Sequence, residues 1–244
     1  MKDLFSNHSL RYKKARPNYS IQIVKEILKH VPERAFAWDC GAGSGQFTQL
    51  LAPYFDHVVA TDISEAQLQQ APYFENVSYQ VQAAEQSSLP AQSIDLVTVA
   101  QAIHWFDFDA FYKEVKRVLK PQGVFAAIGY GLIEVQDAEI NSLVQQLYFE
   151  TLNGYWDSER RYIDELYQTI PFPFNEQAVP EMHLQYQWSP QQLFSYLKTW
   201  SALKHYQEKH HHDPLQFISN ALQAVPENLD VTFPVLLRVG MREK

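Results

Sequence analysis

The residues Ala37-Trp38-Asp39-Cys40-Gly41-Ala42-Gly43-Ser44-Gly45 decide the fold of this chain. They predict the end of a buried strand, then an acidic residue, then glycines at alternate positions that lead into a helix over residues 46–54. Glycine permits a tight turn and lets a ligand approach the backbone where a Cβ would clash. The first N–H groups of the helix lack helical partners and point at the turn. The turn is therefore expected to hold a ligand that bears a nucleoside.

Segments of strand pattern alternate with segments of helix pattern through the first half of the chain. The segment 94–100 is almost continuously apolar, which indicates a strand covered on both faces. Strands separated by helices form βαβ units, which predict an α/β fold with a doubly wound, parallel sheet. The predicted strands are 35–39, 57–61, 77–81, 94–100 and 124–128, and the predicted helices start near residues 20, 47, 64 and 107.

The second half of the chain changes character. A long helical pattern covers 135–152, and further helices are expected after Ser189-Pro190 and Asp213-Pro214. We expect these helices to lie over the carboxyl ends of the strands, where open α/β sheets bind ligands. The chain is interpreted as one domain, 1–244, with an N-terminal cap segment (1–34), a core (35–131), two helical insertions (132–180 and 189–226) and a terminal strand pair (181–188 and 231–239).

Composition limits the classes of function. The net charge of −8 argues against a broad nucleic-acid-binding face, so no nucleic-acid partner is expected. A single cysteine, Cys40, excludes an internal disulfide and indicates a reducing compartment. The first residues show no signal-peptide pattern, and no apolar stretch reaches the roughly 18 residues of a membrane span. We therefore expect a soluble, cytoplasmic protein, monomeric or homodimeric, without a membrane partner.

Two nucleoside ligands compete for the glycine-rich turn. The dinucleotide fingerprint is G-x-G-x-x-G, but here the third glycine, Gly45, comes one position early and Gln46 follows it. Asp62 ends the second predicted strand, where a carboxylate can accept both hydroxyls of a ribose. Ala84 and Glu85 follow the third strand, where a backbone N–H and a carboxylate could bind an adenine edge. All these positions converge on one crevice of the sheet.

At these residues the chain resembles the class I S-adenosylmethionine-dependent methyltransferases, and the similarity extends over nearly its whole length. More narrowly, it resembles the trans-aconitate methyltransferase-like branch, which has a methyltransferase type 11 domain. The run Ala100-Gln101-Ala102-Ile103-His104-Trp105-Phe106 is much more specific than the widely shared glycine loop. Asn18-Tyr19-Ser20 departs from the branch, which often has a second proline there, and this affects loop geometry. The other matching runs are Arg16-Pro17-Asn18-Tyr19, Tyr155-Trp156-Asp157-Ser158-Glu159-Arg160-Arg161 and Ile170-Pro171-Phe172-Pro173-Phe174.

The resemblance implies a seven-stranded sheet with an antiparallel last strand, S-adenosyl-L-methionine as cofactor and S-adenosyl-L-homocysteine as product. It makes residues 35–131 the cofactor-binding core and the helical insertions a lid over the acceptor. Gln101 and Ala102 would line the floor beneath the sulfonium, and Tyr12 and Arg16 would fold over the site. The other implied cofactor ligands are Asp39, Gly41, Ala42, Gly43 and Gly45 at the methionine part, Asp62 at the ribose, Ile63 on the adenine, and Ala84 and Glu85 at its amino group.

Methyl transfer from a sulfonium needs aligned reactants and the exclusion of water, without a protein nucleophile. A base is needed only if the small-molecule acceptor carries a proton. His104 directly follows the fourth strand and is the candidate to face the acceptor, as its base or its orienting group; an ordinary histidine pKa near 6.5 would suit a base. A carboxylate acceptor needs a counter-charge instead, for which Arg160 and Arg161 are candidates. Trp105 and Tyr155 are further candidates for acceptor binding.

Each assignment has a structural alternative. His104 could pack beside Trp105, the two arginines could form surface ion pairs, and Tyr155 could belong to the core. The run His210-His211-His212 is expected to be a polar loop, and no metal site is expected, because three adjacent histidines cannot all converge on one ion. For the whole protein, the alternatives are a nicotinamide-dinucleotide oxidoreductase, against which Gln46 argues, and a non-catalytic S-adenosylmethionine-binding protein on the same scaffold.

Overall fold

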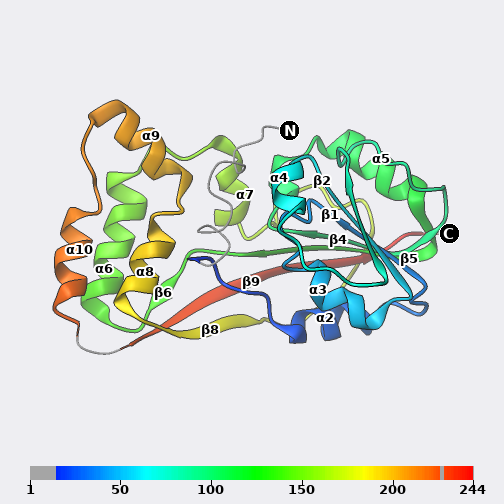
Figure 1. The fold of residues 1–244 in the computed structure, drawn as a ribbon, viewed down its shortest axis with the longest axis horizontal. Coiled ribbons are helices and arrows are strands. Elements are labelled where there is room, and N and C mark those ends of the chain that lie inside the picture. The colour runs from blue at the N-terminus through cyan, green and yellow to red at the C-terminus, as the bar shows by residue number, and fades with distance from the viewer. Residues whose placement is uncertain (1–14, 226–227, 244) are drawn as a thin grey trace.

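The computed structural model describes residues 15–225 and 228–243, which include a nine-stranded sheet (Figure 1). Five parallel strands follow the order β3-β2-β1-β4-β5, and β9 joins β5 in the antiparallel direction. The expected mostly parallel α/β sheet is confirmed, and the two short strands β6 and β7 add to the seven strands expected. The strands are β1 (Phe36–Cys40), β2 (His57–Asp62), β3 (Val77–Val81), β4 (Ile94–Ala100), β5 (Leu119–Tyr130), β6 (Glu134–Val135), β7 (Asn175–Gln177), β8 (His183–Trp188) and β9 (Leu229–Met241).

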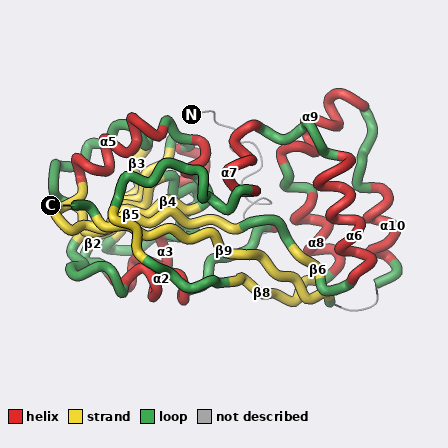
Figure 2. Tube along the Cα trace, turned by 180° about the vertical axis from the view of Figure 1, so that it is seen from behind, coloured by secondary structure: helices red, strands yellow, loops and turns green. Residues whose placement is uncertain are grey.

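Helices cover both faces of the parallel strands, as a doubly wound sheet requires (Figures 1 and 2). Successive strand residues point to opposite faces, so Ala37 and Trp38 of β1 belong to two different hydrophobic clusters. The helices α2 (Ile21–Leu28) and α3 (Thr48–Leu51) contribute to the cluster that contains Ala37. The helix α5 (Phe108–Val118) contributes to the cluster that contains Trp38.

Side-chain caps start two of these helices where the sequence predicts them. Ser20 Oγ accepts a hydrogen bond from Gln22 N at the start of α2, and Asp107 Oδ1 accepts one from Ala110 N at the start of α5. The helices after β1 and β2 are shorter than predicted. The first is only α3 followed by a 3-10 turn, Ala52–Tyr54, and the second is α4 (Glu65–Leu68).

Most of the later helices gather beyond the carboxyl ends of the parallel strands (left of Figure 1), and α7 (Arg161–Asp164) lies between this group and the parallel half. Here α10 packs against both α6 and α8. The helix predicted after Ser189 is divided into α8 and α9 at Thr199 and Trp200. Within the described ranges, none of the helices combines the length and apolar character needed to cross a membrane. The helices are α6 (Ala138–Gln146), α7 (Arg161–Asp164), α8 (Pro190–Leu197), α9 (Ser201–His210) and α10 (Gln216–Gln223).

The strand β9 connects the helical half with the parallel half. Its first residues pair with β8, from Leu229 opposite Trp188 to Pro234 opposite His183. Its remaining residues pair with β5, beginning with Val235 opposite Tyr130. One continuous strand is therefore shared by both halves.

Candidate active site

The glycine-rich turn after β1 has a backbone that only glycine adopts easily. Gly41, Gly43 and Gly45 have φ angles of +71°, +55° and +73°, in the left-handed region. A Cβ on Gly41 would lie 2.7 Å from Ala102 Cβ, which is closer than side chains approach. The turn is anchored to β2, because Gly41 N donates to Thr61 O at 2.8 Å. The turn therefore forms a cradle whose shape depends on having glycine, with no side chain, at positions 41, 43 and 45.

Asp39 fixes the base of this turn from inside the protein. Its carboxylate is 1% exposed and accepts hydrogen bonds from Thr48 Oγ1 at 2.5 Å and Thr98 Oγ1 at 2.8 Å. Burial raises the pKa of the Asp39 carboxyl to about 6, against the opposing effect of the two threonine hydroxyls. Both carboxylate oxygens therefore have partners within the fold. Ala42, the next implied ligand, donates its N–H to Thr61 O at 2.9 Å.

Asp62 stands at the end of β2 and is oriented by two backbone N–H groups. Its Oδ2 accepts from Gly43 N at 2.9 Å, and its Oδ1 accepts from Ser64 N at 2.8 Å. The carboxylate is half-buried, as is the neighbouring Ile63. A carboxylate oxygen can accept more than one hydrogen bond, which is what binding to ribose hydroxyls would require of Asp62.

Ala84 and Glu85 follow β3 and reach the start of α5. Ala84 is buried, whereas Glu85 is half-buried and its Oε1 accepts from Asp107 N at 3.3 Å. The pair therefore lies next to the loop that follows β4, on the same side of the sheet edge as the glycine turn.

Gln101 holds the loop that follows β4. Its Oε1 accepts a hydrogen bond from Tyr130 N at 2.9 Å, and its Nε2 donates one to Tyr130 O at 3.4 Å. The side-chain amide therefore pairs with both backbone groups of the last residue of β5, as a neighbouring strand would. The backbone of Gln101 has a φ angle of +56°, which turns the chain toward Gly41. Ala102, the next residue, is the one whose methyl group faces Gly41. The two residues thus determine how closely this loop approaches the glycine turn.

Arg16 connects the start of the described chain to the helical half. Its Nη1 donates to Tyr130 OH at 3.3 Å, its Nε donates to Thr199 Oγ1 at 3.3 Å, and its Nη2 donates to Thr199 O at 3.4 Å. Arg16 thus joins the end of β5 to the turn between α8 and α9. Tyr12, the other residue expected to fold over the site, lies outside the described residues.

His104 is buried in a 3-10 turn, Ile103–Trp105, and contacts Tyr167 and Trp105. The imidazole is 5% exposed, its Nδ1 lies 3.3 Å from Tyr167 OH, and its ring packs 5.0 Å from that of Trp105. Burial lowers the pKa of His104 to about 3, and the positive charges of Arg160 and Arg16 act in the same direction. This differs from the ordinary pKa near 6.5 that would suit a base. His104 is therefore neutral at physiological pH.

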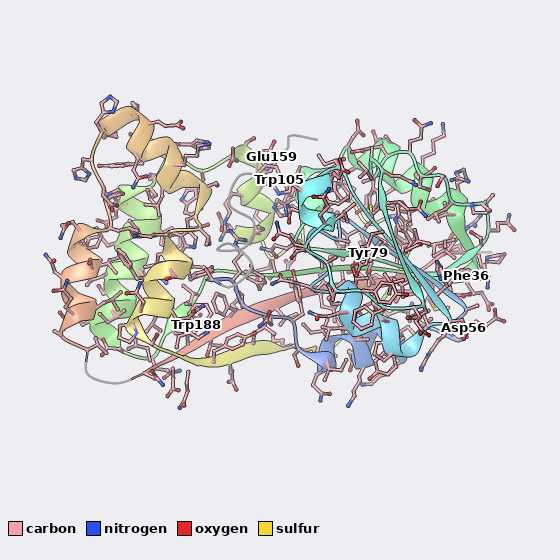
Figure 3. The ribbon with its side chains drawn as sticks, viewed as in Figure 1. Phe36, Asp56, Tyr79, Trp105, Glu159 and Trp188 are labelled. Atoms are coloured by element: carbon pink, nitrogen blue, oxygen red, sulfur yellow. The ribbon has the colours of Figure 1, made fainter. Side chains whose placement is uncertain are left out.

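The adjacent residues Arg160 and Arg161 differ in burial and in the residues that they contact. Arg160 is 16% exposed, donates from Nε to Tyr148 OH at 2.7 Å, and lies over the rings of Tyr148 and Trp156 at 5.2 and 5.1 Å. Arg161 is exposed and donates to the hydroxyl of Tyr162. The structure thus separates the pair, and only Arg160 faces the interior. The 3-10 turn that contains Arg160 contacts the turn of His104; Trp105 and Glu159, one from each turn, are labelled in Figure 3.

The guanidinium of Arg160 is incompletely bonded. Its Nε also lies 3.5 Å from Asp164 Oδ1, but neither terminal nitrogen has a hydrogen-bond partner among the residues that the structure describes. Its charge lowers the pKa values of His104 and Tyr167, and the 3-10 turns that carry Arg160 and His104 are in contact. Tyr155 lies elsewhere: its carbonyl accepts from His205 Nδ1 and its hydroxyl contacts His210, both on α9.

Tyr167 contacts the candidate site residue His104, whereas the sequence favours core packing over a lid pocket for most aromatic residues of this segment. It is fully buried, and a Cβ on Gly129 would lie only 2.8 Å from its hydroxyl. Leu166 and Tyr167 have φ angles of +55° and +62°, a conformation that costs a residue with a side chain about 1–2 kcal/mol. The aromatic segment indicated core packing, and no turn residue such as glycine or asparagine signalled this bend.

Known proteins share both the sequence and the fold. The methyltransferase domain family matches residues 38–127. A Dictyostelium discoideum protein that is named as a methyltransferase is 35% identical over 251 residues, which cover 99% of this chain and 95% of that protein. A solved structure from Anaeromyxobacter dehalogenans, described as a type II methyltransferase, has a TM-score of 0.86 at 38% identity and covers 94% of this chain and 99% of that one.

A more distant structure shows the same fold with the family's ligand. Phosphoethanolamine N-methyltransferase 2 of Haemonchus contortus, solved with S-adenosyl-L-methionine, has a TM-score of 0.52 and covers 98% of this chain and 57% of that one. At 16% identity this likeness concerns the fold alone. The narrower resemblance to the trans-aconitate branch stays a prediction. The full-length relative, the matching domain and the glycine cradle beside Asp62 agree, and the chain belongs to the class I S-adenosylmethionine-dependent methyltransferases.

Proposed function

We propose that this protein transfers a methyl group from S-adenosylmethionine to a carboxylate oxygen of a small acceptor. The observation that carries the proposal is the largely buried guanidinium of Arg160, which contacts Tyr148 and Asp164 through Nε while its two terminal nitrogens have no hydrogen-bond partner among the described residues. Withdrawing part of a guanidinium from water is costly unless polar or anionic partners replace the water at its nitrogens, and Asp164 meets only the Nε edge. A planar guanidinium with two free nitrogens matches a carboxylate.

The cradle after β1 fits the cofactor that the family uses. Gly41, Gly43 and Gly45 would leave room for the methionine part, where a Cβ would close the space. Asp62, held by two N–H groups, would accept the ribose hydroxyls, and Glu85 stands where the adenine amino group is expected. The other proposed cofactor contacts are Asp39, Ala42, Ile63, Ala84, Gln101, Ala102 and Arg16. When bound, S-adenosylmethionine supplies a methyl group that is already activated for displacement.

The chain's own residues would then bind, orient and shield the acceptor. Arg160 would bind one carboxylate edge, and His104 and Trp105 would line the approach from the loop after β4. A carboxylate is ionised at neutral pH and needs no base, which agrees with the lowered pKa of His104. An amine or phenol acceptor would require a base, and a histidine with a pKa of about 3 is poorly matched to that task.

Labelled S-adenosylmethionine and a panel of small carboxylic acids, each with its neutral amide, test the proposal. Methyl transfer to an acid should give a product whose label is released by mild alkali as methanol, as an ester is and an N-methyl group is not. Transfer to amines, or to amides as well as acids, would contradict the carboxylate assignment. No transfer to any acceptor, with the cofactor bound, would favour the non-catalytic alternative.

Two matched variants test the role of Arg160. Arg160→Met should raise the KM for the acceptor about 30-fold or more, because a charged hydrogen-bonded pair contributes roughly 2 kcal/mol or more. Arg161→Met removes the same charge one residue away and should change that KM by less than about twofold, since Arg161 is exposed. Equal effects of the two substitutions would show that only the general positive charge matters.

A further inference from the structure

The hydroxyl of Tyr167 has one polar contact within the described residues, and it is with His104. The hydroxyl lies 3.3 Å from His104 Nδ1, and among residues 15–225 and 228–243 it has no other hydrogen-bond partner. The side chain is fully buried and fits across Gly129, where even a methyl group would collide with the hydroxyl. The position of this hydroxyl is therefore closely determined by the fold.

The backbone that carries Tyr167 is held in a costly conformation by a residue from β9. Arg238 Nη1 donates to Tyr167 O at 3.0 Å and to Ile170 O at 2.7 Å. The same guanidinium binds both oxygens of Glu176, at 2.7 and 2.8 Å. Backbone strain of this kind persists only where the surroundings impose it, and it is found preferentially at functional sites. The bend at Leu166 and Tyr167 is therefore maintained by contacts from other elements, including those of Arg238.

The proton between Tyr167 and His104 has one favourable arrangement. If Nδ1–H donated to the phenol oxygen, the phenol O–H would be a buried donor without an acceptor among the described residues. If the phenol O–H donates to Nδ1, neither group loses a hydrogen bond, and the imidazole carries its proton on Nε2. Burial raises the pKa of the Tyr167 hydroxyl well above its usual value and lowers that of His104, so both groups stay neutral.

We propose that Tyr167 is a positioning residue that holds His104 as the Nε2–H tautomer, so that His104 donates a hydrogen bond to the acceptor carboxylate beside Arg160. The acceptor half of this statement rests on the proposed function. The assignment replaces a general base with a hydrogen-bond donor. It follows that the acceptor must arrive already ionised, and that a neutral amine or alcohol in the same pocket would find no group to take its proton.

The tautomer can be measured without any acceptor. Protein labelled with ¹⁵N-histidine is observed by long-range ¹H–¹⁵N correlation, and His104→Gln identifies the signals of His104. The wild-type protein should show Nε2 protonated and Nδ1 unprotonated. Tyr167→Phe should allow the Nδ1–H tautomer to appear, while Tyr162→Phe, which removes a hydroxyl from the same segment, should leave the spectrum of His104 unchanged.

A second variant moves the hydroxyl without removing it. Gly129→Ala should displace Tyr167 and produce the same change at His104, so the test stands even if Tyr167→Phe does not fold. Cofactor affinity should remain within about twofold in both variants, while kcat for the acceptor should fall at least tenfold. A wild-type spectrum with Nδ1 protonated would overturn the proposal, as would a tautomer unaffected in both variants. Absence of transfer to carboxylates with the expected tautomer would refute the proposed function but not the control of His104 by Tyr167.

Discussion

Replacing Asp62 by asparagine should weaken cofactor binding strongly. The carboxylate already accepts Gly43 N and Ser64 N, and two ribose hydroxyls would add to these bonds. Hydrogen bonds to a charged acceptor contribute roughly 1.5–3 kcal/mol each, and an amide keeps only one acceptor oxygen while its NH₂ group faces a backbone N–H. We expect a loss of about 2–4 kcal/mol, which corresponds to about 30- to 700-fold in Kd.

Isothermal titration with S-adenosylmethionine and with S-adenosylhomocysteine measures this loss. Glu65→Gln is the matched control, because Glu65 is exposed on the first turn of α4 and its substitution removes the same charge three residues away. Its Kd should remain within about twofold of the wild-type value. If Asp62→Asn remained folded and bound either ligand within threefold of the wild type, the cofactor would not lie on the end of β2, and the assigned site would be wrong.

Two further predictions concern stability, measured by urea unfolding. Arg238→Met should lower the free energy of unfolding by about 2–4 kcal/mol, because the guanidinium bonds to the carbonyls of two buried residues. Glu176→Gln should lower it by less than about 1 kcal/mol, since Glu176 is 46% exposed. Similar losses in the two variants would show that the ion pair, and not the carbonyl contacts, stabilises this region. The pKa of His104 is about 3 when folded and near 6.5 when unfolded, so the unfolded chain binds more protons between these values and stability should decrease by up to about 1.4 kcal/mol per unit as pH falls through that window. His104→Gln should remove this part of the slope, and an unchanged slope would mean that His104 titrates normally in the folded protein.

The parallel core could be predicted because its signals are local. The bounds of β3 and β4 agree with the predicted strands, and the glycine turn is recognisable since Gly41, Gly43 and Gly45 are required by their own φ angles. The sequence could not show which way Arg160 and Arg161 point, because that depends on Tyr148 and Trp156 packing around one of them.

The surroundings of the candidate site residues were harder to predict than the strands that carry them. The lowered pKa of His104 results from burial by segments distant in sequence, which no local pattern records. The bend at Leu166 and Tyr167 is likewise imposed from β9 by Arg238, across about seventy residues. Similarly, the division between α8 and α9 follows from packing around Trp200, for which the sequence has no proline or glycine signal.

The shared strand β9 also determines when the two halves of the sheet can finish folding as the chain is synthesised. Both β5 and β8 leave the ribosome with an edge that only the last described residues of the chain can cover. Until residues 229–241 emerge, the parallel half and the helical half each expose an unpaired strand edge, the feature that makes nascent chains prone to aggregate. The Tyr167 bend therefore reaches its final geometry in one late step, when Arg238 arrives with the strand that carries it.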